Sequence, residues 1–342
     1  MIIDKSFLSA RINKLKPIVP GKMAPEVMQG ILMKEGSIIA YNLEVAMRTK
    51  ITDTDETFII PQTAIDLIPK LPDGDIELKY ENDQLYINAS GIKSKHATLS
   101  PNEYPALPGR NGEQFIIDGA ALSSILHAIS HAIAVDQSRP SITGVLIESA
   151  GEQLELTATD GHRVSIGKIP FDGAVSCIIP KQAVQRIVAL NILEEIEITC
   201  DKNTITFDAG EYSIMSRLLE EAFPNVKSIF KNSHKHTTSI NKYALIEIVE
   251  RASLASDIIR VKIEGNEATI IARSKLSEHI ETMGIEEEIS GIDMAFSAKK
   301  LLETIKSVDG NTIKAQTDGN LTPLFLIGEA ITSLILPRRE RE

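Results

Sequence analysis

The stretch Ile60-Pro61-Gln62-Thr63-Ala64 ends a strand-like run and opens a helix-like run, and the same construction returns twice. It reappears at Ile179-Pro180 before residues 181–190, and at Phe296-Ser297 before residues 298–307. Pro180 lies 119 residues after Pro61, and Ser297 lies 117 residues after Pro180. A period of about 118 residues is too long for a solenoid unit and fits a whole domain. The sequence therefore predicts one domain copied three times, over residues 1–113, 114–233 and 234–342.

A second helix pattern opens each copy. Ile3-Asp4, Ile117-Asp118 and Ile240-Asn241 each precede apolar residues that are spaced by three or four positions, as on one face of a helix. Asp and Asn side chains can accept hydrogen bonds from the free N–H groups at a helix start. Strand-like runs follow both helices of each copy. The predicted fold class is α+β, with a domain of two helices and two small sheets present three times.

Composition sets the class of protein. Of the 342 residues, 43% are hydrophobic but only 4% are aromatic and none is Trp, so we expect aliphatic cores. Cys177 and Cys200 fall in apolar or alternating runs, which favours two reduced, buried thiols over a disulfide or a metal site. No apolar run approaches the roughly 20 residues of a membrane span, and the start lacks a signal-peptide pattern. We expect a cytoplasmic protein.

The net charge of −11 argues at first against a nucleic-acid partner, but the charges are unevenly distributed. The six predicted helices (5–16, 62–71, 119–134, 181–190, 242–254 and 298–307) contain four acidic and twelve basic residues, a net +8. The basic ones are Lys5, Arg11, Lys14, Lys16, Lys70, Lys181, Arg186, Lys242, Arg251, Lys299, Lys300 and Lys306. Helix propensity alone would admit Glu equally well. The excess predicts a shared basic surface that binds phosphate without reading base sequence.

The most specific local string is Thr159-Asp160-Gly161-His162-Arg163, between two apolar-alternating runs. Asp-Gly in this setting predicts a tight turn, since Gly tolerates positive φ. A catalytic interpretation would pair His162 with Asp160 or Ser165, but no nucleophile elbow stands nearby, so we predict no enzyme activity. No glycine-rich nucleotide loop occurs, so we predict no cofactor. The pair of histidines in 234–236 lacks a third metal ligand and is interpreted as part of a solvated linker.

Together with the triple repeat, this turn resembles the bacterial DNA sliding clamp, the beta subunit of DNA polymerase III. The resemblance covers the whole chain and is strongest over 142–165 and 71–78, with further likeness in Tyr104-Pro105-Ala106-Leu107-Pro108 and Glu221-Ala222-Phe223-Pro224. It implies a head-to-tail homodimer that forms a ring around duplex DNA. It also implies a non-catalytic processivity factor whose partners, namely polymerase, clamp loader and repair proteins, bind through short peptide motifs.

The resemblance also implies two sets of site residues. The partner-peptide pocket would consist of Ile142, Thr159, Gly161, His162, Arg163, Val164, Pro224, Ser228, Ile229, Leu334, Ile335, Leu336 and Pro337. The DNA contacts would be Lys14, Lys22, Arg139, Lys181, Lys299 and Lys300. Lys22 and Arg139 can equally be read as exposed loop cations.

Three departures from the family pattern bear on these expectations. The family usually ends in an apolar residue, whereas Pro337 here is followed by the charged residues Arg338-Arg339-Glu340-Arg341-Glu342, read as a solvated tail. Ser228 stands where the family usually has Arg, and the third copy is short around 257–259. A divergent clamp is the main prediction. The alternative is a clamp-fold interaction scaffold that no longer encircles DNA, against which the basic helices argue.

Overall fold

The computed structural model describes residues 1–231 and 233–339. Within these residues lie six α-helices, and each one confirms a helix predicted from the sequence. Their bounds are α1 Lys5–Leu15, α2 Gln62–Leu67, α3 Gly119–Ile129, α4 Lys181–Leu190, α5 Lys242–Ser253 and α6 Ala298–Ser307. The second helix is shorter than the predicted 62–71, because Pro69 lacks an N–H to continue the α-helical hydrogen bonding. The last turn is a 3₁₀-helix instead.

Short 3₁₀-helices also occur between the helices and strands of the described part of the chain. They are η1 Lys16–Ile18, η2 Glu26–Gln29, η3 Ile68–Lys70, η4 Pro101–Glu103, η5 Ser130–Ala132, η6 Pro140–Ile142 and η7 Lys227–Ile229.

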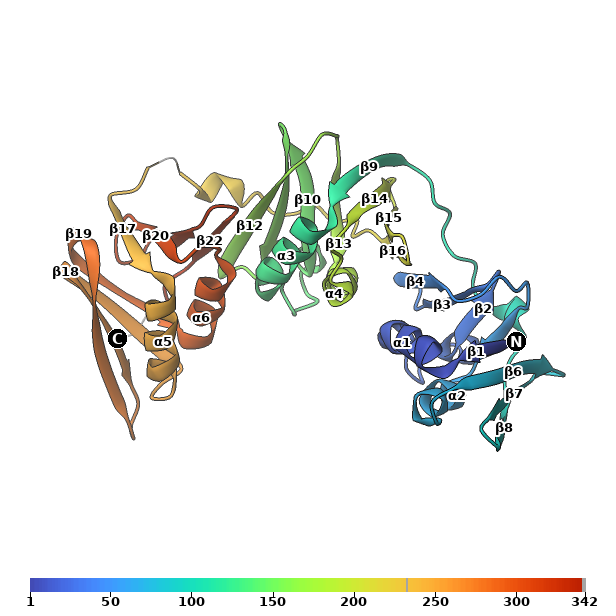
Figure 1. The fold of residues 1–342 in the computed structure, drawn as a ribbon. Coiled ribbons are helices and arrows are strands. Elements are labelled where there is room, and N and C mark those ends of the chain that lie inside the picture. The colour runs from blue at the N-terminus through green and yellow to red at the C-terminus, as the bar shows by residue number, and fades with distance from the viewer. Residues whose placement is uncertain (232, 340–342) are drawn as a thin grey trace. The chain divides into compact units, whose positions relative to one another are not determined.

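Contacts divide the chain into two compact units, each described here by itself. The first unit comprises Met1–Ala120 and Gln185–Leu218. Its larger sheet has the strand order β5-β2-β3-β4-β16-β15-β14-β9 (Figure 1). These strands are β5 Phe58–Ile60, β2 Ile31–Lys34, β3 Ser37–Tyr41, β4 Val45–Lys50, β16 Tyr212–Arg217, β15 Thr204–Ala209, β14 Glu195–Cys200 and β9 Glu113–Asp118. The antiparallel pairing of β4 with β16 joins the two halves into one sheet.

A second sheet of this unit has the order β1-β6-β7-β8. Its strands are β1 Ile2–Asp4, β6 Asp75–Glu81, β7 Gln84–Ala89 and β8 Ile92–Ala97. Asp4 ends β1 and also caps α1, since its carboxylate accepts the N–H of Phe7 at 2.8 Å. The cap predicted at Asp4 is therefore confirmed.

The second unit comprises Ala121–Val184 and the chain from Leu219 onward. Its larger sheet has the order β13-β10-β11-β12-β22-β21-β20-β17. These strands are β13 Ser176–Pro180, β10 Gly144–Ala150, β11 Gln153–Thr159, β12 Arg163–Pro170, β22 Ile331–Ile335, β21 Leu324–Ile327, β20 Thr312–Thr317 and β17 His236–Asn241. The central joint is the pairing of β12 with β22, in which Arg163 stands opposite Ile335 and Ser165 opposite Ser333. The buried hydroxyls of those two serines lie 2.8 Å apart.

A long two-stranded ribbon, β18 Ile258–Arg273 and β19 Glu278–Ser297, completes this unit beside α5 and α6 (Figure 1). The side chain of Asn241 accepts the N–H of Ala244 at 3.0 Å, which confirms the predicted cap of α5. Only a few residues separate the end of α5 at Ser253 from the start of β18, as the short third copy predicted. A register shift on either side of Gly265 marks where one continuous ribbon replaces separate strands.

The cores are aliphatic, as the composition predicted. The large side chains that are almost fully buried are mostly Ile, Leu and Met, with Phe58, Phe207 and Phe296 among them. In the described part of the chain, Cys177 is buried, Cys200 is half-buried rather than buried, and neither forms a disulfide. No helix within 1–231 and 233–339 is long and apolar enough to cross a membrane. Equally, these residues contain no cluster of three or more His, Cys, Asp or Glu side chains that could hold a metal ion.

One expectation about the linker before β17 was wrong. His234 is not solvated: its side chain is only 3% exposed, and its ring packs 4.4 Å from that of Phe325, centroid to centroid. The aromatic ring of a strand residue, distant in sequence, provides this packing. The three domain boundaries remain a prediction.

Candidate functional site

The turn between β11 and β12 confirms the tight turn predicted from Asp-Gly. Gly161 has φ +82°, a conformation that other residues adopt with strain. The Asp160 carboxylate accepts the N–H groups of His162 at 2.9 Å and Arg163 at 3.1 Å. The Thr159 hydroxyl donates to the carbonyl of Arg163 at 2.8 Å. These bonds within the turn fix the positions of its side chains.

Arg163 is buried, with a side chain only 6% exposed. Its guanidinium lies 2.7 Å from the Glu303 carboxylate and donates to Asp160 at 3.3 Å. It also donates to the backbone carbonyls of Lys300 at 3.3 Å and His131 at 2.5 Å. A buried Arg with this many acceptors is satisfied, so it holds the turn against α6.

The charged groups around Arg163 shift the pKa values of Asp160 and His131. Burial raises the pKa of Asp160, but the His162 N–H, the Lys300 ammonium 3.0 Å away and Arg163 offset it, so the pKa lies below its usual range. Burial, together with the charge of Arg163, lowers the pKa of His131 to about 4. At neutral pH, Asp160 is therefore an anion and His131 is uncharged.

A cavity of about 390 Å³ opens beside this turn. Of the thirteen pocket residues predicted, ten line it: Ile142, Thr159, Gly161, His162, Arg163, Val164, Pro224, Ile229, Leu334 and Leu336. Val164, Val226 and Leu334 belong to a buried apolar cluster beneath it. We call this cavity the groove. An apolar floor with a few fixed polar groups is suited to an extended peptide with apolar anchors.

Three predicted residues lie outside the groove. The Ser228 side chain is exposed, and its hydroxyl donates to the carbonyl of Asn225 at 3.1 Å. Ile335 faces the opposite side of β22 from Leu334 and Leu336, because side chains alternate along a strand, and it joins the core around α6. Pro337 lines a neighbouring cleft instead.

Sequence reasoning missed several groove residues. These are Ser138, Arg139, Pro140, Ser141, Glu221, Ala222 and Val226. Val226 could have been found, because it is the last residue of the segment Phe223-Pro224-Asn225-Val226, which matches Tyr104-Pro105-Ala106-Leu107. The segment 138–141, which includes the start of η6, carries no periodic signal that would place it.

A second cleft, of about 470 Å³, adjoins the groove at His162 and Leu336. Its other lining residues are Ser297, Lys300, Ile335, Pro337, Arg338 and Arg339. The backbone of 336–338 is anchored here, since the N–H of Leu336 donates to the carbonyl of His162 at 2.9 Å and that of Arg338 to the carbonyl of Ala295 at 2.7 Å. The exposure of Arg338 and Arg339 agrees with the predicted solvated tail, although the backbone of Arg338 is anchored. Residues 340–342 of that prediction lie outside the described residues.

The predicted DNA-binding residues differ in their surroundings. Lys14, Lys22 and Lys299 are exposed, and Lys181 is half-buried at the start of α4. The ammonium of Lys14 donates to the carbonyl of Ala189 at 2.7 Å. Lys300 is half-buried and bound to Asp160, whereas Arg139 is exposed and lines the groove.

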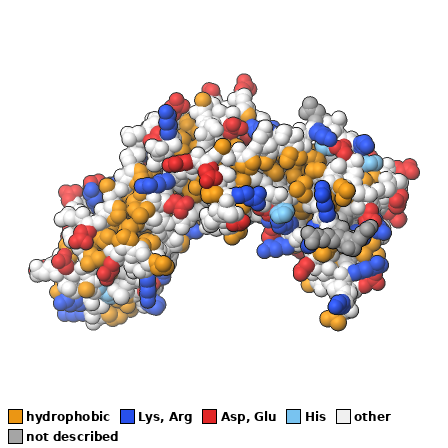
Figure 2. Space-filling model, turned by 180° about the vertical axis from the view of Figure 1, so that it is seen from behind, with side chains coloured by type: hydrophobic (Ala, Val, Ile, Leu, Met, Phe, Trp, Pro, Cys, Tyr) orange, Lys and Arg blue, Asp and Glu red, His pale blue; other side chains and the backbone are white. Residues whose placement is uncertain are grey.

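Several helix cations also have acidic partners. Ion pairs join Arg11 to Glu211, Lys5 to Asp73 (2.9 Å), Lys16 to Asp66 (2.7 Å), Arg251 to Glu281 (2.6 Å) and Lys306 to Glu250 (2.6 Å). Figure 2 shows basic and acidic side chains interspersed on one face of the molecule. The helix charge of +8 thus overstates the free positive charge. The pairs of Lys16, Arg251 and Lys306 are exposed and therefore weak, so a phosphate can compete for these three cations. The side chains of Lys5 and Arg11 are only 14% and 13% exposed.

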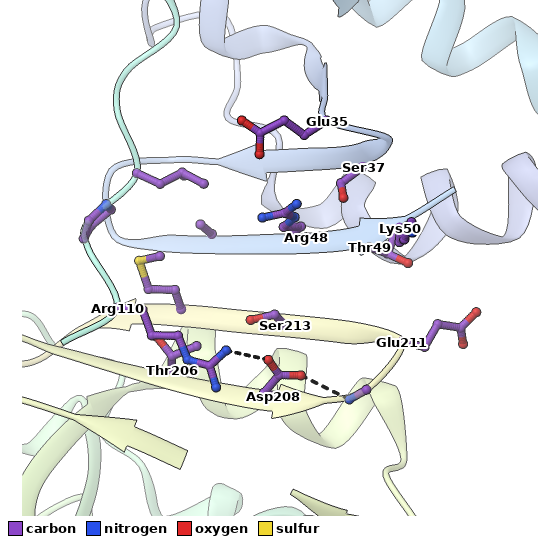
Figure 3. Close-up of a pocket in the computed structure, with 15 residues that line it drawn as sticks. Glu35, Ser37, Arg48, Thr49, Lys50, Arg110, Thr206, Asp208, Glu211 and Ser213 are labelled. Atoms are coloured by element: carbon purple, nitrogen blue, oxygen red, sulfur yellow. Dashed lines mark hydrogen bonds and ion pairs between the residues drawn. The ribbon is translucent and has the colours of Figure 1, made fainter. Parts of the chain in front are cut away.

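The first unit contains a larger cavity, of about 570 Å³, that is lined by residues of the neighbouring strands β3, β4, β16 and β15 and by Leu107, Pro108 and Arg110 (Figure 3). The guanidinium of Arg110 lies 2.8 Å from the Asp208 carboxylate and 2.6 Å from that of Glu197. Asp208 also accepts the N–H of Gly210 at 3.2 Å. These pairs bind the segment around Arg110 to the sheet. We assign this cavity no function.

Comparison with known proteins bears on the identity of the chain. Residues 116–225 match the family described as DNA polymerase III beta subunit, central domain. A "Beta sliding clamp" of Staphylococcus epidermidis is 26% identical over 97% of this chain and 97% of its own length. The chain is thus similar to bacterial sliding clamps over almost its whole length.

Solved structures agree on the fold. The DNA polymerase III subunit beta of Pseudomonas aeruginosa superposes with a TM-score of 0.91 at 19% identity, over 99% of this chain and 100% of that one. The beta subunit of Streptococcus pyogenes DNA polymerase gives a TM-score of 0.91 at 21% identity, over 99% of each chain. The sliding-clamp fold thus extends over nearly the whole chain, the continuous ribbon β18–β19 included.

Proposed function

We propose that the chain is a DNA sliding clamp, a non-catalytic processivity factor that encircles duplex DNA and tethers the replicative polymerase. The observation that carries this function is the match to proteins named beta sliding clamp over almost the full length of both chains. The central-domain family match and the fold support it. They do not favour the alternative, a scaffold that no longer encircles DNA. A cytoplasmic location, where such a factor would meet bacterial DNA, is part of the proposal.

The ring itself is proposed to be a head-to-tail dimer of three-domain chains. Strand pairing supports it: β4 pairs with β16, and β12 pairs with β22, so two sheets continue from one predicted domain into the next. Among the described residues, β8 has a ladder with β7 alone, which leaves its other edge open. An open strand edge is a template for pairing with another chain. A second copy can use it, as closed symmetry requires.

The partner of β8 can be inferred from the repeat. The end of β19 leads directly into α6, just as β5 leads into α2 and β13 into α4. The end of β19 is therefore the equivalent of β5 and β13 in the third copy. The start of β19, residues 278–285, then corresponds to β4 and β12, the two strands that continue a sheet. Transferring the register of those pairs places Glu278 of one chain opposite Lys95 of a second copy. Opposite charges facing each other across strands stabilise pairing.

DNA and partner peptides are assigned to different surfaces. Lys14, Lys181 and Lys299 on the helices, with Lys22 in a loop, are proposed to contact phosphates, which requires no base recognition. The groove is proposed to bind short peptide motifs of the polymerase, the clamp loader and repair proteins. The support is its apolar floor and the rigid turn at Gly161.

Light scattering after size exclusion tests the proposed ring. The expected mass is twice the 37.5 kDa of one chain. A single-chain mass that persists at micromolar concentration and moderate salt would rule out the closed ring.

A further inference from the structure

We propose that the cleft beside the groove selects partner peptides that carry acidic residues next to their apolar anchors. This inference rests on the proposed function of the groove. It adds the chemistry of the partner: a peptide with apolar side chains for the groove and carboxylates for the cleft.

The two cavities are neighbours with a shared wall. His162 and Leu336 line both the groove and the cleft, and the hydrogen bond from the Leu336 N–H to the His162 carbonyl joins them. The His162 side chain is exposed, and Leu336 is 40% exposed. A peptide seated in the groove therefore reaches the cleft as soon as it passes these two side chains.

The lining of the cleft is positively charged. Lys300, Arg338 and Arg339 contribute to it, and no carboxylate side chain lines it among the described residues. This is unusual for a chain whose net charge is −11. Charge complementarity therefore favours an acidic segment over a basic or neutral one.

The three cations are not equally available. The Lys300 ammonium is 3.0 Å from Asp160, which is itself hydrogen-bonded within the turn. Arg338 and Arg339 are exposed, and within the described part of the chain their side chains have no ion pair. The Arg338 backbone is anchored to Ala295, so its side chain starts from a fixed position. We therefore assign the selectivity mainly to these two arginines.

Fluorescence anisotropy with two labelled peptides tests the assignment. Both have the same apolar anchors, one flanked by two Asp residues and the other by two Asn residues. The full-length protein should bind the Asp peptide about five- to tenfold more tightly at low salt, the scale of two or three exposed charge pairs. Because exposed pairs are screened, the preference should shrink in 0.5 M salt.

Two double variants with the same change in net charge distinguish an effect of the cations in the cleft from an effect of the overall charge of the protein. Arg338→Glu with Arg339→Glu should abolish or invert the preference while binding of the Asn peptide changes little. The control, Lys202→Glu with Lys235→Glu, changes exposed cations that do not line the cleft and should retain the preference. Removing residues 340–342 should also retain it.

The outcomes distinguish this inference from the groove itself. Equal binding of both peptides, with binding lost in Leu336→Asp, would leave the groove in place and overturn the acidic preference. A preference that survives the double arginine reversal, or is lost equally in the control, would also overturn it. If neither peptide binds the unaltered protein, the proposed groove is wrong, and this inference fails with it.

Discussion

At the turn between β11 and β12, adjacent residues have different roles. Gly161 permits the backbone conformation, Asp160 fixes the turn, and His162 stands exposed between the groove and the cleft. Arg163 is buried and contacts Glu303. The turn was predictable, because Asp-Gly between alternating runs is a local signal. The burial of Arg163 was not, because its partners on α6 are more than 130 residues away in sequence.

The first prediction concerns Arg163. Replacement by Met leaves the Asp160 and Glu303 carboxylates without their buried partner. This should lower the free energy of unfolding by about 3–5 kcal/mol. Urea unfolding followed by circular dichroism measures it. Arg273→Met, which breaks an exposed pair with Glu278, is the control and should cost much less. Equal, small losses in both variants would show that the Arg163 network does not stabilise the fold.

The second prediction concerns pH. The pKa of His131 is 6.5 in an unfolded chain and about 4 in the fold. Below pH 6.5 the unfolded state therefore binds a proton that the folded state does not. Stability is full above pH 6.5 and falls by about 3 kcal/mol as the pH drops to about 4.

The matched variant for pH is His131→Met, which removes the titrating group. Its urea midpoint should change less between pH 7 and pH 4.5 than that of the unaltered protein. Asp160, whose pKa lies below 3.8, titrates outside this window. Parallel pH profiles for the two proteins would contradict the assignment to His131.

At the scale of helices, the sequence predicted where each helix lies but not which of its cations are free. Lys299 and Lys300 are adjacent on α6, yet Lys299 is exposed and Lys300 is bound to Asp160. Helical periodicity separates faces, but it does not identify an acid contributed by a distant turn. The same limit explains the paired Lys5 and Lys306.

A third prediction follows for DNA binding. Lys14→Glu with Lys299→Glu should weaken binding to any duplex and lower the slope of log K against log salt by about 2 per chain, if each lysine contacts one phosphate. Anisotropy of a labelled duplex at several salt concentrations measures it. The control pair Lys202→Glu with Lys235→Glu has the same charge change. An unchanged slope in the helix variant would remove these helices from the DNA surface.

A fourth prediction concerns the strand edges. Lys95→Glu should place two carboxylates opposite each other between copies and shift the protein toward the single-chain mass. Glu278→Lys in the same chain should restore the dimer, although it also breaks the pair with Arg273. Light scattering compares the three proteins. A double variant no more dimeric than Lys95→Glu alone would contradict the proposed register.

For the whole molecule, the fold class could be predicted because the strand-to-helix junctions at Pro61, Pro180 and Ser297 recur about 118 residues apart, which is the length of a domain. The helix starts recur in the same way. The groove was predicted through ten of its residues from a family resemblance, not from periodicity. Contacts between segments that are distant in sequence could not be predicted. The anchoring of Arg338 on Ala295 and the packing of His234 on Phe325 both join segments that no local pattern relates.

Encirclement of DNA is tested most directly by topology. The protein is mixed with a linear duplex, the ends are joined by ligase, and the product is passed through a sizing column in 0.5 M salt. The proposed ring predicts that protein elutes with the circle and is lost once a restriction enzyme cuts it. Protein that leaves the closed circle at the same rate as the cut one would contradict the sliding clamp.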